Sequence, residues 1–259
     1  MEIKEKARIF GVPVSTIERD YAQNWLLKHI SKINMVLKGG TGIKKVYNEN
    51  YRFSDDLDFT LSEKFNENNL NNEINSAIES ARDESGIDFS QNIKLEKNIN
   101  GFTTGISINL IQRGGLPVKI KLDITDFDKE KIILPILNKE IIHTYSDSFK
   151  AKTPVYNLKE IIAEKIRALF ERTRPRDLYD VWYFLVESNL KVSKDITGKK
   201  IKFKKVKIDL SSLEKRKNDF AHAWKNSLNH QINNLPDFEL VYNKTINILK
   251  EYETSKTKI

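Results

Sequence analysis

The spacing of apolar residues changes near residue 150, and this change constrains the fold more than any other feature of the chain. Before it, several short stretches alternate apolar and polar residues, which is typical of strands with one buried face. After about residue 158, apolar residues recur at helical spacing. We therefore expect an α+β protein, with a sheet-bearing domain over residues 1–150 and a helical bundle over residues 151–259.

The individual elements follow from the same patterns. Ser15 opens an S-x-x-E sequence, which predicts a capped helix running to about residue 29. Polar but periodic residues predict a helix over 66–85 that Gly86 ends. The turn-rich link RGGLP at 113–117 predicts a hairpin. Strands are expected at 35–40, 52–61, 92–99, 102–112 and 117–125, and helices at 157–172, 176–188, 211–228 and 235–253.

Composition removes several classes of function. The chain of 259 residues has no cysteine, which excludes disulfide scaffolds, thiol nucleophiles and cysteine-ligated metal sites. Its 4 histidines lack the spacing of a histidine metal site. The charged N-terminal sequence is unlike a signal peptide, and no apolar run approaches the ~20 residues that span a bilayer. We expect a cytoplasmic protein without a membrane partner.

The formal net charge of +8 comes from one segment. Residues 191–217 hold 11 basic and 3 acidic residues, and the rest of the chain is neutral. A clustered basic excess is typical of a nucleic-acid contact, although a solvated surface loop has the same composition. Alternating residues within 199–208 predict a short β-ribbon on the helical domain, with its lysines in solvent. The lysines expected to contact nucleic acid are Lys202, Lys204 and Lys207.

A glycine pair follows the predicted strand at 35–40 and precedes a segment of helical character. Gly39 and Gly40 would let backbone N–H groups approach a phosphate at the start of a helix, and Thr41 adds a hydroxyl. Two glycines alone are a common turn. Their interpretation as a phosphate-binding segment therefore depends on what lies beside them.

Two carboxylates share one face of the predicted strand at 52–61. Asp56 and Asp58 are two residues apart, so they point the same way. Side-by-side carboxylates repel unless a cation lies between them, and oxygen-only ligands suit Mg²⁺ or Mn²⁺. Asp123 lies on the polar face of the strand at 117–125. If the two strands are neighbours, the three carboxylates meet over one metal site.

The order of these features matches a known superfamily. A glycine pair with threonine, a helix, D-x-D on a strand and a later strand aspartate form the pattern of nucleotidyltransferases. LKGGTGIKKVY and RFSDDLDFTL together resemble the AbiEii/AbiGii toxin family, the nucleotidyltransferase-like toxins of bacterial type IV toxin–antitoxin systems. TIERDYAQNWLL and AEKIRALFERTRPRDLYDVW are similar to further parts of that family, so the resemblance covers roughly residues 15–188.

The resemblance implies both a fold and a reaction. The fold is a mixed sheet flanked by helices and followed by a helical bundle. The reaction transfers a nucleoside monophosphate from a nucleoside triphosphate to an acceptor, which in some relatives is the 3′ end of tRNA. An RNA acceptor and a cognate antitoxin are the partners that the resemblance suggests for this chain.

The resemblance also implies roles for single residues. Asp56 and Asp58 would hold Mg²⁺ against the triphosphate, and Asp123 would help to bind the catalytic metal and activate the attacking hydroxyl. The residues implied for binding the β- and γ-phosphates are Gly39, Gly40 and Thr41.

Lys165 interrupts the apolar stripe of the helix predicted at 157–172. A lysine on a buried face needs a partner or a function, although its long stem could also carry the ammonium to the surface. Lys165 matches the motif lysine of the family, which implies a catalytic role as a triphosphate ligand. Asp177 and Asp180 begin the next helix and could orient this lysine, which adds Asp177 to the nucleotide site unless it only caps that helix.

Two other functions remain open at this point. Residues 5–22 also look like a helix-turn-helix of a DNA-binding regulator, with a short helix, a turn at Gly11 and a second helix. Alternatively, the nucleotide acceptor could be a protein hydroxyl or a small molecule, because a lysine-rich segment does not identify the acceptor.

Overall fold

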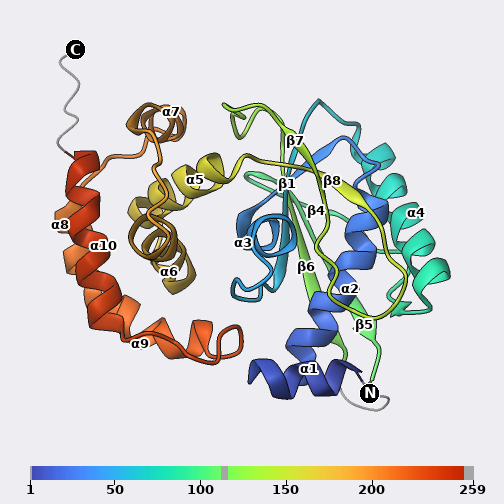
Figure 1. Ribbon diagram of the computed structural model, residues 1–259. Coiled ribbons are helices and arrows are strands. Elements are labelled where there is room, and N and C mark those ends of the chain that lie inside the picture. The colour runs from blue at the N-terminus through green and yellow to red at the C-terminus, as the bar shows by residue number, and fades with distance from the viewer. Residues whose placement is uncertain (1, 112–115, 254–259) are drawn as a thin grey trace. The chain divides into compact units, whose positions relative to one another are not determined.

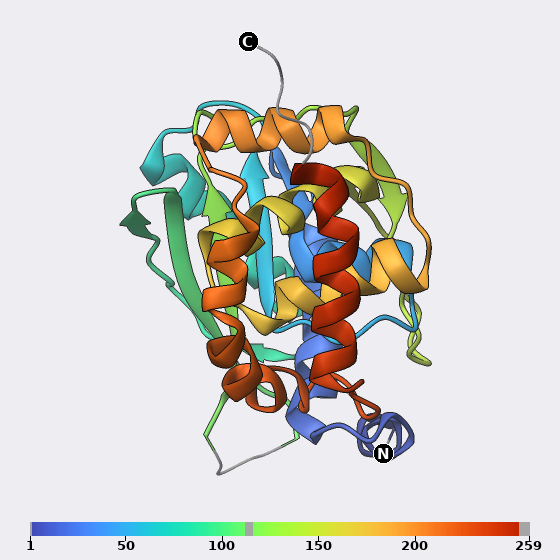
Figure 2. The same ribbon diagram turned by 90° about the vertical axis from the view of Figure 1, so that its left-hand side faces the viewer.

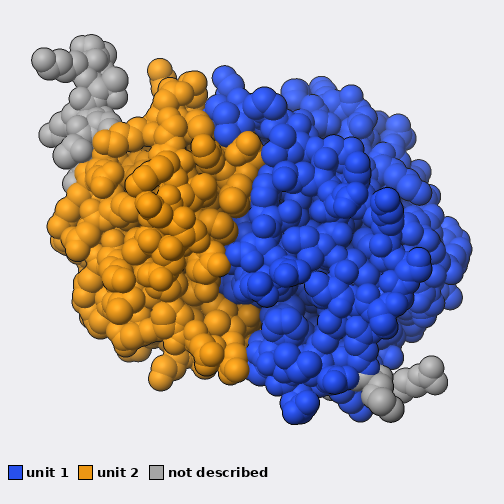
Figure 3. Space-filling view, in the orientation of Figure 1, with its two compact units in different colours: residues 1–156 blue, residues 157–259 orange. Residues whose placement is uncertain are grey.

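The computed structural model describes residues 2–111 and 116–253. The chain divides into two compact units, Met1–Tyr156 and Asn157–Ile259, which Figure 3 distinguishes by colour. All strands found among the described residues belong to the first unit, and the second unit contains helices. The first unit extends past residue 150 because β8 (Lys152–Val155) pairs with β1 (Met35–Lys38).

A mixed sheet forms the centre of the first unit (Figure 1). Within the described residues it has 8 strands in the order β3-β5-β6-β2-β1-β8-β7, and β4 pairs with β5. The pairs β2–β6 and β1–β8 are parallel, and the others are antiparallel. This confirms the predicted fold class. The other strands are β2 (Asp56–Leu61), β3 (Asp88–Phe89), β4 (Glu96–Asn98), β5 (Gly101–Asn109), β6 (Val118–Thr125) and β7 (Leu137–Glu140).

The predicted hairpin is present as the antiparallel pair β5–β6. Most of its link, RGGLP, lies outside the described residues, which omit 112–115. The strand expected at 92–99 is shorter, since only Glu96–Asn98 pairs with β5.

Two helices, α2 (Val14–Ile30) and α4 (Glu67–Ser85), cover one face of the sheet (Figure 1). Alternate residues of the central strands, such as Leu57 and Phe59, are buried in the core that these helices share with the sheet. The residues between them point to the opposite face, which is where the predicted acidic residues lie. The remaining helical segments of this unit are α1 (Glu2–Phe10), α3 (Gly39–Gly42) and the π-helix η1 (Ile43–Tyr47).

The predicted start of α2 is wrong by two residues. The helix begins at Val14 with Pro13 as its N-cap, and no side chain caps it. Proline has a fixed φ close to the helical value and lacks an N–H, so the chain enters the helix directly after it. Ser15 therefore lies inside the first turn and closes no capping box.

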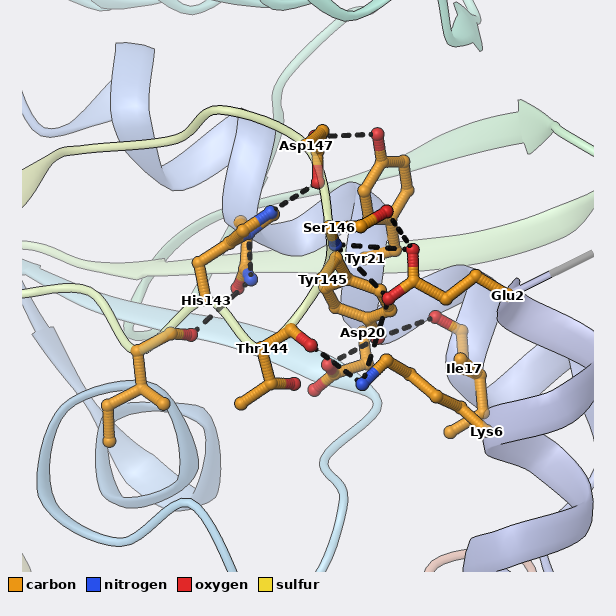
Figure 4. Close-up of polar contacts among 12 residues, drawn as sticks. Glu2, Lys6, Ile17, Asp20, Tyr21, His143, Thr144, Tyr145, Ser146 and Asp147 are labelled. Carbon is orange, nitrogen blue, oxygen red and sulfur yellow. Dashed lines mark hydrogen bonds and ion pairs between the residues drawn. The ribbon is translucent and has the colours of Figure 1, made fainter.

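Hydrogen bonds tie the loop at residues 143–147 to the two N-terminal helices (Figure 4). Lys6 Nζ donates to the backbone carbonyl of Thr144 at 2.6 Å. The Tyr145 hydroxyl donates to Asp20 Oδ2 of α2 at 2.8 Å. Through these bonds the chain segment that leads into β8 fixes the position of α1 and α2.

The second unit is a set of helices, seen face-on in Figure 2. Buried aromatic and aliphatic residues on α6, α9 and α10 form much of its interior. The helical segments are α5 (Leu158–Glu171), α6 (Pro175–Trp182), the π-helix η2 (Tyr183–Glu187), α7 (Lys194–Lys204), α8 (Leu210–Lys215), α9 (Lys217–Leu228) and α10 (Phe238–Glu253).

The β-ribbon predicted at 199–208 is wrong, because most of this segment belongs to α7. The Ser193 side chain caps the helix by accepting from the Asp195 backbone N–H. Its buried residues recur at helical spacing, at Ile196, Thr197, Lys200 and Ile201. The alternation at Ile201 and beyond is too short to outweigh this longer helical period.

Lys200 is fully buried rather than solvated. Its ammonium lies 2.8 Å from Glu160 and 2.9 Å from Glu164, both on α5. A buried lysine needs such carboxylates, so Lys200 joins α7 to α5 and is unavailable to a polyanion.

No helix among the described residues has the length and the apolar composition needed to cross a membrane.

Gly101 offers a test of the sheet. It lies at the β4–β5 turn with φ +145°, and a Cβ there would come within 2.2 Å of the Ile124 carbonyl oxygen. We expect Gly101→Ala to reduce the free energy of unfolding by about 1–3 kcal/mol through backbone strain, and the clash with the Ile124 carbonyl oxygen adds to this loss. Urea unfolding checks this. Gly105→Ala on the same strand is the control, since nothing lies within 4 Å of its added carbon; an equal loss in both variants would contradict the explanation.

Candidate active site

Two predicted acidic residues lie side by side on neighbouring strands. β2 and β6 run parallel, and their register places Asp58 beside Asp123 and Asp56 beside Lys121. In parallel strands, paired residues point to the same face of the sheet. The structure therefore brings Asp58 and Asp123 together on the face opposite the core helices.

Asp123 is held by two neighbours. The Thr103 hydroxyl, from β5, donates to Asp123 Oδ1 at 2.6 Å, and Lys121 Nζ donates to Oδ2 at 2.6 Å. In the part of the chain that the structure describes, the Asp58 carboxylate has no such hydrogen bond or ion pair. The two acids thus differ. Asp123 has a fixed orientation and a counter-charge, and the Asp58 carboxylate is available to bind a ligand.

The glycine pair lies directly against these strands. Gly39 has φ +68°, and a Cβ there would lie 2.3 Å from Asp58 Oδ2. A Cβ on Gly40 would lie 2.9 Å from both Arg52 Nη2 and Ser54 Oγ. Glycine is needed at position 39 because of its positive φ and because a Cβ would collide with the Asp58 carboxylate. At position 40 a Cβ would instead displace the side chains of Arg52 and Ser54, which precede β2.

Thr41 is fully buried, and its hydroxyl donates to the Asp56 backbone carbonyl. This bond joins the glycine segment to the first residue of β2. The Thr41 hydroxyl is thus directed to the strand in this structure, and its binding to a phosphate stays a prediction.

Helix α2 holds the start of β2 from its other side. Arg19 Nη1 lies 2.8 Å from Asp55 Oδ1, and Arg19 Nε donates to the Lys119 carbonyl at 3.0 Å. Gln23 Nε2 donates to the Ser54 carbonyl at 3.0 Å. Sequence analysis missed these residues, since no local pattern relates them to residues more than thirty positions away.

The burial of α2 argues against the DNA-binding alternative. A helix-turn-helix does occur locally, as α1, the Gly11 turn with φ +60° and α2. A recognition helix must present its side chains to the major groove. In α2 most residues are buried, and Arg19 is already bound to the sheet.

Lys45 is a further residue that the sequence patterns missed. It lies on η1, just after the glycine segment, and its Nζ is 2.6 Å from the Asp20 carboxylate of α2. Burial lowers the pKa of Lys45 to about 8, although Asp20 favours the charged form. The ion pair fixes η1, and with it Gly39–Gly42, against α2.

In the second unit, Lys165 meets both predicted aspartates. Its Nζ is 2.7 Å from Asp177 and 3.2 Å from Asp180, and both carboxylates are buried. Arg172 Nε also donates to Asp177 at 2.8 Å. Burial alone would raise the pKa of Asp177, but Lys165 and Arg172 outweigh it and hold that pKa well below 3.8. The predicted lysine and its orienting acids are therefore in contact.

The residues present fit a magnesium ion held by two carboxylates, with waters or substrate phosphates as its other ligands. Among the described residues, no group of three or more His, Asp or Glu side chains is arranged to hold a metal. The predicted meeting of three carboxylates is thus reduced to the adjacent pair, Asp58 and Asp123. Mg²⁺ prefers oxygen ligands, keeps several waters and is commonly held by one or two carboxylates plus substrate phosphates.

The fold is similar to those of two solved structures. MenT4, a nucleotidyltransferase toxin from Mycobacterium tuberculosis H37Rv, matches with a TM-score of 0.68 and 17% identity, over 95% of this chain and 86% of that chain. JHP933 from Helicobacter pylori matches with a TM-score of 0.54 and 19% identity, over 94% of each chain. No curated protein matches the sequence.

A family model decides the identity. The model described as nucleotidyl transferase AbiEii toxin, type IV toxin–antitoxin system, matches residues 24–244. The chain belongs to the AbiEii toxin family. It is therefore a nucleotidyltransferase of the type IV toxin class, which confirms the resemblance seen in the sequence motifs. Membership implies a nucleoside triphosphate substrate and an antitoxin partner.

The Lys165 cluster predicts a pH-dependent loss of stability. Lys165→Met leaves two buried carboxylates without their ammonium, which we expect to cost about 3 kcal/mol at neutral pH. Because the folded-state pKa of Asp177 is lowered, its stabilisation is fully present above pH 3.8 and is lost progressively as the pH falls from 3.8 toward that lowered pKa. The difference from the wild type should therefore shrink in acid.

Urea unfolding at pH 7 and pH 3 measures this difference. Lys159→Met, at an exposed position of the same helix, is the control and should match the wild type at both values. A Lys165→Met variant as stable as the control at pH 7 would contradict the assignment.

Proposed function

We propose that this AbiEii family member is a Mg²⁺-dependent nucleotidyltransferase that moves a nucleoside monophosphate from a nucleoside triphosphate to RNA, at the 3′ end of tRNA. The observation that carries the proposal is the position of Asp58, which lies between Asp123 on one side and Gly39 on the other. A metal-binding acid beside a phosphate-approaching backbone is what transfer from a triphosphate requires.

Different residues of the first unit would bind the metal ion and the phosphates. Asp58 and Asp123 would hold Mg²⁺, with Asp56 beside them on β2, and the ion would neutralise charge on the triphosphate. The backbone at Gly39 and Gly40 would bind the β- and γ-phosphates.

Asp123 is also suited to act as the proton acceptor. The acceptor hydroxyl oxygen forms a bond to the α-phosphorus, the bond to the β-phosphate oxygen breaks, and pyrophosphate leaves. The hydroxyl proton passes to the Asp123 carboxylate, whose orientation the Thr103 hydroxyl fixes. Thr41 contributes by holding the glycine segment against β2.

Lys165 is the residue of the second unit that we expect to contact a phosphate. A lysine ammonium has three N–H donors, and Asp177 and Asp180 are its carboxylate partners. The remaining donor can bind a phosphate oxygen, while the two aspartates keep the side chain in place. Asp177 would thus act through Lys165 rather than on the nucleotide itself.

The RNA acceptor is supported by the lysines of residues 191–217. Lys202 and Lys207 are exposed, and Lys204 is half-buried at the end of α7. Lysine contacts with phosphates release counterions, which makes binding strong and salt-dependent. Transfer to a protein hydroxyl or a small molecule is the alternative, and the test below separates it from RNA.

Incubation with each labelled triphosphate, Mg²⁺ and total RNA tests the reaction. We expect label in the tRNA band, and a loss of at least about 100-fold for Asp58→Asn and Gly39→Ala, because one removes a metal ligand and the other forces a side chain onto Asp58. Asp128→Asn, whose side chain is 58% exposed, is the control. Label on protein alone, or activity retained by Asp58→Asn, would overturn the proposal.

The basic segment has its own test. Changing Lys202, Lys204 and Lys207 to Glu should weaken RNA binding and flatten its dependence on salt, since fewer counterions are released. The control changes the exposed lysines Lys32, Lys94 and Lys97 of the first unit, which alters the net charge equally. Fluorescence anisotropy at several salt concentrations measures the RNA affinity of each triple variant and its dependence on salt. Equal effects in the two triple variants would show that net charge, not this segment, attracts RNA.

A further inference from the structure

Lys121 occupies a distinctive position on the proposed catalytic face. It precedes Asp123 by two residues on β6, so both side chains point to the same face, and its ammonium lies 2.6 Å from Asp123 Oδ2. Across the sheet, Lys121 is paired with Asp56 on β2 and with Gly105 on β5. It is the basic residue in contact with the acid proposed to bind metal.

Two adjacent carboxylates need a positive charge even before any metal binds. Asp58 and Asp123 are direct neighbours in the β2–β6 register, and like charges in this position destabilise a sheet. The Lys121 ammonium supplies such a charge at Asp123, while Lys38 of β1 is the register neighbour of Asp58. Lys121 thereby occupies the Asp123 oxygen that a divalent cation would need, while Thr103 binds the other oxygen.

The ion pair is built so that it can open. The Lys121 side chain is 53% exposed and that of Asp123 is 32% exposed, and exposed pairs contribute little to stability. Gly105, the β5 neighbour of Lys121, has no side chain, and nothing lies within 4 Å of the position that a Cβ would take. The lysine can therefore turn away from Asp123 without a steric barrier on that side.

We propose that Lys121 is an exchangeable counter-ion for Asp123, which the divalent cation must displace to bind. This inference rests on the proposed metal-dependent function. Lys121 is a positioning residue: it neutralises the two carboxylates in the metal-free protein and keeps Asp123 in the orientation set by Thr103. Because the cation must displace Lys121, the protein binds it more weakly than it would if the two carboxylates had no lysine beside them.

Mn²⁺ binding without nucleotide tests this, measured by titration calorimetry or by the electron paramagnetic resonance signal of free Mn²⁺. We expect Lys121→Met to bind Mn²⁺ about two- to fivefold more tightly than the wild type, the factor that loss of an exposed ion pair supplies. Lys121→Arg should stay close to the wild type. Lys119→Met, which removes an exposed lysine from the same face of β6, should change the affinity less.

A double variant tests whether Lys121 acts through Asp123. In an Asp123→Asn background, Lys121→Met should no longer alter the Mn²⁺ affinity, since the competing pair is gone. Unchanged or weaker binding by Lys121→Met, or no measurable binding by either protein, would overturn the inference. Asp58→Asn separates the two proposals: if it binds Mn²⁺ as the wild type does, the metal site of the proposed function is wrong.

Discussion

The parallel pairing of β2 with β6 is the constraint on which the rest of the site depends. It places Asp58 beside Asp123, and a slip of one residue would turn Asp58 toward the core helices. Contacts from two helices maintain the register: Arg19 and Gln23 of α2 hold the segment before β2, and Thr41 of α3 holds its first residue. The acids therefore keep their position although their charges repel.

Three lysines with acidic partners join the helical segments, and Lys45 and Lys200 among them are buried. Lys45 joins η1 to α2 through Asp20, Lys165 joins α5 to α6, and Lys200 joins α7 to α5. Desolvation offsets most of the attraction in such pairs, so they contribute more to specific geometry than to net stability. Lys121 differs from all three, since its pair with Asp123 is exposed and can be broken at little cost.

Local patterns predicted the strands and helices that carry the acids, and long-range pairing explains what they missed. Alternation located β2 and β6, and helical spacing located α4 and α5. β7 and β8 are short and carry few apolar residues, because they form by pairing with each other and with β1. The sequence could not predict that Asp58 and Asp123 are neighbours, because the pairing of two strands and their register do not follow from either strand alone. The partners of Lys165, Asp177 and Asp180, were predictable because both belong to one short sequence motif at the start of α6.

The net charge of residues 191–217 overstates the number of lysines that can contact RNA phosphates. Lys200 is buried between two glutamates, and Lys199 lies 2.7 Å from Asp195 within the same helix. Each of these lysines contributes to the net charge, but its field is largely cancelled by the acid beside it. The salt dependence of binding counts phosphate contacts rather than formal charge. The segment should therefore act as a patch of a few exposed lysines around the end of α7, weaker than its net charge suggests.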